Sequence, residues 1–195
     1  MNKLNNLICT SLLMLFSVQA SANLSLNNEQ SALHFVSVKK SSIAEVHHFS
    51  ELAGKFDDQS GEVSIEINLA SVETLIPIRN ERMQALLFET ELYPKAVISA
   101  KVDVSKINKL AVGEIYHTKQ NFKLNLHGIN NAMDAVVAIT KLKNGKFNVT
   151  SVKPVIVQAA NFELLNGINS LKNIANLPSI TTQVPVTFNL VFESK

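Results

Sequence analysis

The sequence predicts an all-β fold, a lipocalin-like antiparallel β-barrel of about eight strands capped by one or two short helices. Apolar and polar residues alternate with a period of two along most of the chain, which is the pattern of strands with one solvated face. Turn residues separate these segments at regular intervals, as they do in barrels and sandwiches. One stretch, residues 72–94, changes to helical spacing, and we expect it to cover one end of the barrel.

The first 22 residues have the organisation of a secretory signal peptide. Lys3 supplies a positive charge, residues 12–16 are apolar, and Ala20-Ser21-Ala22 matches a cleavage site. The apolar run is too short to span a bilayer as a permanent helix, so no integral membrane anchor is expected. We therefore expect cleavage after Ala22, export to the periplasm, and one mature domain covering residues 23–195.

Composition excludes several classes of function. The single cysteine, Cys9, lies in the segment expected to be removed, so cysteine nucleophiles and zinc–thiolate sites are excluded from the mature chain. The formal net charge is only +2 and no run of Lys or Arg stands out. This argues against nucleic-acid binding and against strong binding to anionic membranes.

Nine segments show the strand pattern. In chain order they are residues 31–39, 43–49, 62–69, 96–104, 110–117, 121–127, 133–142, 147–157 and 181–192. The alternation is clearest in residues 62–69, where one face carries Val63, Ile65, Ile67 and Leu69. We expect this face to point inward because the opposite face carries Glu66. Asn144-Gly145 predicts a type I′ hairpin turn, since both central positions of that turn need positive φ.

Two segments have the spacing of a helix with one apolar face. Within residues 72–94, Met83, Leu86 and Leu87 recur at i, i+3 and i+4. A second apolar stripe covers about residues 162–174. Short helices beside a closed sheet are natural end caps.

An ordered set of short motifs extends over nearly all of the mature chain. The motifs are SALHF at 31–35, GKF at 54–56 with SG at 60–61, VET at 72–74, IRNERM at 78–83, LF at 87–88, YP at 93–94, VGE at 112–114, LHG at 126–128 and ANFEL at 160–164. This combination resembles the YceI-like family of bacterial polyisoprenoid-binding proteins. The chain departs from the family pattern at Lys39, Asn80, Asn161 and Glu163, where the family tends to have His, Asp, Asp and Gly.

The resemblance implies a secreted, lipocalin-like barrel that holds a long isoprenoid or similar amphiphile, such as a polyprenyl chain or a quinone. No other cofactor is expected. The histidine spacing shows no metal-ligand pattern, and the sequence shows no serine-nucleophile motif or acid/base pair, so no metal and no catalytic residue are expected either. The partner would be a hydrophobic small molecule, and a homodimer stays open. The residues expected to line the cavity are Phe35, Phe56, Val63, Ile65, Ile67, Leu69, Met83, Leu87, Phe88, Phe122, Leu124, Phe162 and Phe188. Arg79 and Arg82, three apart on the first helix, are expected to meet the head group.

Each of these assignments has a structural alternative. The phenylalanines could form an ordinary packed core. Arg79 could bond a carboxylate or strand carbonyls while Arg82 lies in water. Adjacent strand residues such as His47 and His48 point to opposite faces, which argues against a shared metal site. At the level of function, the alternative to a carrier is a non-enzymatic structural or stress-response module with a filled barrel. An enzyme acting on a lipid is the weakest alternative.

Overall fold

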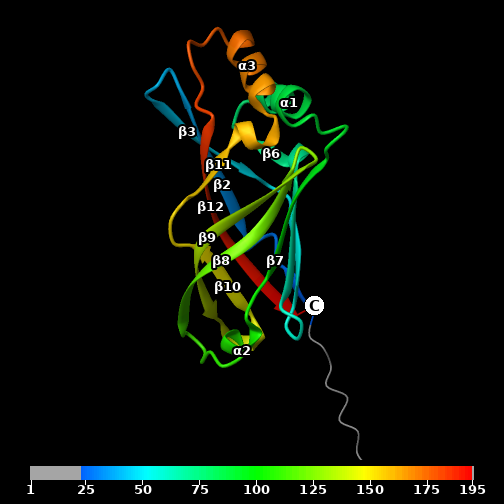
Figure 1. Cartoon of the computed structure of the whole chain (residues 1–195), viewed down its shortest axis with the longest axis vertical. Helices are drawn as coiled ribbons and strands as arrows, with labels where there is room; N and C mark the ends of the chain where they lie inside the picture. Colours follow the sequence, from blue (N-terminus) through cyan, green and yellow to red (C-terminus); the bar gives the residue numbers. More distant parts are fainter. Residues whose placement is uncertain (1–22, 195) are drawn as a thin grey trace, which may run out of the picture.

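The structure, a computed structural model, describes residues 23–194 and consists of strands with a few short helices (Figure 1). The strands are β1 (Asn23–Leu26), β2 (Ala32–Lys39), β3 (Ile43–Phe49), β4 (Leu52–Asp57), β5 (Glu62–Asn68), β6 (Val72–Glu73), β7 (Lys95–Lys101), β8 (Ile115–Leu126), β9 (Ile129–Lys141), β10 (Phe147–Ser151), β11 (Val155–Gln158) and β12 (Gln183–Ser194). The helices are α1 (Pro77–Arg82), a π-helical turn η2 (Met83–Phe88), α2 (Val104–Ile107) and α3 (Leu165–Ile174), with 3-10 turns η1 (Leu69–Ser71), η3 (Lys143–Gly145) and η4 (Ala159–Phe162).

Eight strands form a closed antiparallel ring, which confirms the predicted fold class. The ring runs β1-β4-β5-β7-β8-β9-β10-β12 and closes where β12 pairs with β1. The remaining strands extend members of the ring. β1 and β2 lie along one edge of β12, and β10 and β11 lie along the other. The barrel therefore has the closed antiparallel architecture of lipocalin-like barrels. At some positions around the ring, two shorter strands take the place of one long strand.

Several predicted boundaries were wrong. Residues 110–117 and 121–127 were expected to be two strands, but β8 is continuous because it pairs with β9 along its whole length. Its start lies after α2, which the periodicity did not reveal. The predicted strand 147–157 is broken at residues 152–154, next to Pro154, which has no N–H to donate to a ladder. The sequence pattern indicated only a turn motif at β4 and did not indicate β1.

Other local predictions are confirmed. Asn144 and Gly145 have φ values of 59° and 72°, and the Lys146 N–H donates to the Lys143 carbonyl, as a type I′ turn requires. The strand expected at 62–69 ends at Asn68, whose side chain accepts a hydrogen bond from the Ala70 N–H and caps η1. Glu66 faces outward, where its carboxylate lies 2.5 Å from Lys95 Nζ.

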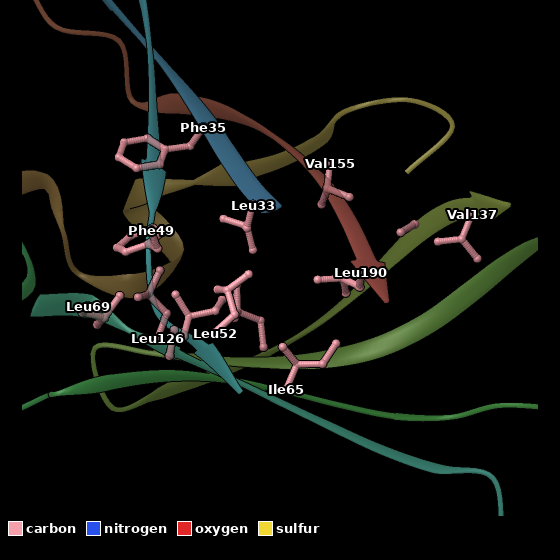
Figure 2. Close-up of a cluster of buried hydrophobic side chains, with 14 of the residues drawn as sticks. Leu33, Phe35, Phe49, Leu52, Ile65, Leu69, Leu126, Val137, Val155 and Leu190 are labelled. Carbon is pink, nitrogen blue, oxygen red and sulfur yellow. The ribbon is translucent and has the colours of Figure 1, made fainter. Parts of the chain in front are cut away.

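The core fills the inside of the barrel with side chains from nearly every strand. Figure 2 shows Leu33, Phe35, Phe49, Ile65 and Leu126, which come from several strands, within this buried cluster. Ile65, Ile67 and Leu69 are each no more than 6% exposed. The face of β5 that was expected to point inward therefore does so.

The two larger helical segments cover the same end of the barrel. α1 and α3 lie together at the top of Figure 1, while α2 lies at the opposite end. α3 approaches η2 at Gly167, where a Cβ atom would lie 2.5 Å from the Leu86 carbonyl oxygen. A glycine is needed at this contact for steric reasons, because any side chain would push α3 away from η2.

Within residues 23–194, no helix is both long enough and apolar enough to cross a bilayer.

Candidate functional site

Three cavities follow one another along the barrel axis. We call them the lower chamber, with a volume of about 110 Å³, the upper chamber, about 150 Å³, and the mouth, about 360 Å³. Both chambers are lined by Leu33, Ile98, Phe122 and Phe188, which form a waist between them. Phe35, Leu87, Ile168 and Val184 line both the upper chamber and the mouth. The three cavities therefore adjoin one another in a row, which we call the path, with shared side chains between neighbouring cavities.

The predicted lining residues are distributed along this path. Phe56, Val63 and Ile65 line the lower chamber. Ile67, Leu69, Phe88 and Leu124 line the upper chamber, and Met83 lines the mouth. Phe35, Leu87, Phe122 and Phe188 lie at the junctions described above.

Phe162 is the exception among the predicted lining residues. It is only 1% exposed and belongs to the packed core, but it lines none of the three cavities. It lies in η4, the turn that precedes α3, so it packs the base of the capping helix. Its place on the helical stripe made it look equivalent to Ile168, which does line the path.

The mouth carries more positive than negative charge. Glu45 Oε2 lies 2.9 Å from both Lys39 Nζ and Arg79 Nη1, so one carboxylate serves two cations. Arg79 Nη2 also donates to the Thr74 carbonyl at 2.5 Å. The hydrogen bond from Lys39 lowers the pKa of Glu45, which keeps the carboxylate ionised. Arg82 lines the same cavity and has no ion pair within the described part of the chain.

These contacts give the two arginines different environments. Arg79 is held by a carboxylate and a carbonyl, which is the structural alternative, although it also lines the mouth. Asn80 is turned away from it: Asn80 Oδ1 accepts from the Thr74 N–H at 2.9 Å and from Thr74 Oγ1 at 2.6 Å. Asn80 thus orders the turn before α1, and Glu45 supplies the negative charge beside Arg79. Among the described residues, Arg82 is the mouth arginine without an acidic partner.

His47 is a buried polar residue on the wall of the mouth. It is 3% exposed, its Nε2 shares a 3.0 Å hydrogen bond with Ser37 Oγ, and its Nδ1 has no partner among the described residues. Burial lowers the pKa of His47, and the Arg79 charge lowers it further, so the imidazole is neutral at neutral pH. Arg79 Nε is likewise buried without a described partner. Unpartnered buried polar atoms are rare in native proteins, so these two atoms are candidates for bonding a ligand.

Sequence reasoning missed Glu45 and His47 as site residues. Both lie on the same face of β3 as Phe49, because they are separated from it by four and two residues. That period could have placed them inside the barrel. The pairing of Glu45 with Arg79 could not be seen, because it joins β3 to α1 across 34 residues of sequence.

The chemistry of the site favours binding. Ser37 and His47 are in contact, but His47 Nδ1 meets no described carboxylate that could orient it as a general base. In residues 23–194, no group of three His, Cys, Asp or Glu side chains is placed to hold a metal ion. The path itself is apolar in both chambers and becomes polar only at the mouth.

Comparisons with known proteins agree with this geometry. The family model of the YceI-like domain matches residues 24–192. A polyisoprenoid binding domain from Saccharophagus degradans, implicated in plant cell wall breakdown, is 37% identical with a TM-score of 0.86, over 90% of this chain and 100% of that chain. A search of curated proteins found no match.

Two more distant structures share the fold. BcnA from Burkholderia cenocepacia is 18% identical with a TM-score of 0.61, over 85% of this chain and 98% of that one. The Campylobacter jejuni YceI protein is 16% identical with a TM-score of 0.52, over 76% of this chain and 85% of that one. At these identities the likeness concerns the fold alone.

Proposed function

Because this chain belongs to the YceI-like family, we propose that it is a periplasmic carrier or reservoir for an isoprenoid-like lipid, a polyprenyl or quinone-type amphiphile held inside the barrel. The observation that carries this proposal is the row of adjoining apolar chambers that leads to a basic mouth. The polyisoprenoid binding domain of S. degradans, 37% identical over its whole length, supports the ligand class. The signal-peptide pattern in residues 1–22, which lie outside the described residues, supports export.

The size of the chambers supports a thin, flexible tail. An engineered apolar cavity of about 150 Å³ stays dry and binds benzene. The upper chamber has this volume, so it has room for about one isoprene unit. Each buried CH₂ group contributes about 0.8 kcal/mol, and affinity therefore rises with the length of tail that enters. A tail that reaches both chambers must pass the waist, so Phe122 and Phe188 would have to change rotamer to admit it.

The mouth would hold the polar end of the lipid. Arg82 offers a charge with no acidic partner in the described residues, and His47 Nδ1 and Arg79 Nε offer hydrogen-bonding capacity that the described side chains leave unused. A phosphate or a quinone oxygen could bond to the arginines. The protein would act by binding and releasing its ligand without chemical change.

Native mass spectrometry of the protein purified from its own periplasm tests the proposal. We expect added masses that correspond to a bound isoprenoid lipid, and uptake of a fluorescent polyprenol by the delipidated protein. An empty barrel that also takes up no polyprenol would favour the alternative, an interaction module whose barrel is filled by its own side chains.

Arg82→Gln is expected to weaken binding of a polyprenyl phosphate by about tenfold, because a charge-assisted hydrogen bond contributes about 1.5 kcal/mol or more. Binding of a neutral quinone with the same tail should be nearly unchanged. Titration of both ligands by intrinsic or probe fluorescence measures the difference. Glu81→Gln, a change on the exposed side of the same helix, is the control. Equal losses for both ligands would place Arg82 in a structural role.

A further inference from the structure

We infer that the end of the barrel around the mouth docks on an anionic lipid bilayer, so that a ligand passes between membrane and barrel without crossing water. This inference rests on the proposed function for the nature of the cargo. The docking surface, which we call the rim, consists of exposed aliphatic side chains at the capped end of the barrel. They are Ile43, Leu75, Ile76, Ile78 and Ile174, with exposures of 42%, 85%, 43%, 50% and 50%.

The rim surrounds the opening of the ligand path. Ile76 and Ile78 line the mouth itself. Ile43 begins β3 and pairs with Lys39, which also lines the mouth. Ile174 lies in the last turn of α3 between two mouth residues, Leu171 and Ala175. The segments lie together at the top of Figure 1, although they are far apart in sequence.

Leu75 is the most exposed large apolar residue of the described chain and is held outward by its backbone. Its φ is 63°, a left-handed conformation that is unfavourable for a leucine. The Leu75 N–H donates to the Glu73 carboxylate, which fixes this conformation. Strain of this kind persists where the surrounding structure enforces it, commonly at a functional surface.

The charges of the rim match an anionic membrane. Lys40, Arg82 and Lys172 have no ion pair within the described residues. Glu73 is occupied by the backbone of Leu75 and by Asn80 Nδ2, which leaves Glu81 as an exposed acid on α1. The overall charge of the chain argued against strong membrane binding, but the fold gathers separate cations beside apolar side chains. Such a combination gives weak, reversible binding at the interface.

A bilayer fits the rim better than a second copy of the chain. In a two-fold dimer the same patch faces itself, so the unpaired cations of each copy would meet. That arrangement would also close the mouth. A bilayer neutralises the cations with its head groups and presents hydrocarbon to the opening.

Vesicle flotation tests the rim, with vesicles of phosphatidylcholine alone and vesicles of equal parts phosphatidylcholine and phosphatidylglycerol. The delipidated wild-type protein should float with the mixed vesicles and less with phosphatidylcholine alone. Leu75→Asn with Ile174→Gln, two rim residues that line none of the three cavities, should lower the partition coefficient at least tenfold, because full burial of one such side chain is worth about a factor of ten or more. Asparagine also tolerates the left-handed conformation at position 75.

A matched control lies at the other end of the barrel. Val112 and Ile115 are 59% and 56% exposed, so Val112→Asn with Ile115→Gln removes similar apolar area away from the rim and should float as the wild type does. Lys40→Gln with Lys172→Gln should lower binding to the mixed vesicles by about fivefold per charge and leave binding to phosphatidylcholine unchanged.

Equal flotation of the rim and control variants would overturn the inference, as would a wild-type protein that does not float. A rim variant that changes the sedimentation coefficient but not the flotation would overturn it too, and would identify the rim as a contact between copies. Binding of a fluorescent polyprenol in vesicle-free solution is measured on the same variants. The rim variant should keep this affinity, so docking and ligand binding can each fail without the other.

Discussion

Ala135→Phe is expected to lower the affinity for a long polyprenyl tail by at least a hundredfold while leaving a short-tailed analogue almost unaffected. Ala135 is 4% exposed and lines the lower chamber, which has a volume of about 110 Å³. A phenyl ring placed there occupies the space of about one isoprene unit, because a cavity of similar size is filled by benzene. Losing five buried carbons costs about 4 kcal/mol, or roughly three orders of magnitude in affinity.

Ala132→Phe is the matched control for this substitution. Ala132 lies on the same strand, β9, three residues away, on the outward face and exposed. Isothermal titration with two polyprenols of different tail length compares the variants. If Ala135→Phe binds the long tail as tightly as Ala132→Phe does, the lower chamber is not part of the ligand path. The stability of Ala135→Phe should remain near that of the wild type, since the ring fills existing space.

Gly167→Ala is expected to destabilise the protein by about 2 kcal/mol or more, by overpacking the contact between α3 and η2. An alanine Cβ would lie 2.5 Å from the Leu86 carbonyl oxygen and 2.7 Å from Leu87 Cα, both backbone atoms that cannot rotate away. In an uncrowded helix the same change would stabilise by about 1 kcal/mol. The sign of the change in the free energy of unfolding therefore reports whether α3 and η2 are in close contact.

Urea unfolding of Gly167→Ala beside Asn169→Ala measures this effect. Asn169 is exposed on the same helix, so its replacement by alanine should be neutral or slightly stabilising. Because Leu87 and Ile168 line both the mouth and the upper chamber, displacement of α3 should also speed the release of a bound lipid. A Gly167→Ala protein as stable as the wild type would mean that α3 moves freely over the barrel end.

Sequence alternation predicted the parts of this structure that depend on local pattern. The inward face of β5 follows from period two, and the caps follow from the helical spacing of Met83 and Leu87. Whether a strand is continuous or interrupted does not follow from the alternation, because it depends on which neighbour each segment pairs with. β8 shows this most clearly: its polar residues 118–120 look like a break, but the ladder with β9 continues through them.

In the candidate site too, the positions that depend on local pattern could be predicted and those that depend on long-range contacts could not. Cavity-lining positions such as Ile67 and Phe188 could be predicted because burial repeats along a strand. The role of Arg79 could not, because it depends on Glu45, which the fold brings to 2.9 Å from a distant strand. Phe162 was misplaced because a helical stripe shows which side is buried but not what it is buried against.

The closing of the ring at β12 has a consequence for the order of folding. Hairpins such as β8–β9 join neighbours in sequence and can form early, but β12 must pair with β1 and β2 across most of the chain. The bond from Asn27 Nδ2 to Glu193 Oε1 joins residues 166 positions apart. Until residues 183–194 are in place, the strands that pair with β12 have hydrogen-bonding edges without a partner. A chain exported from the cytoplasm in unfolded form would thus be unable to close its barrel until β12 is available. It would need protection from aggregation during that interval.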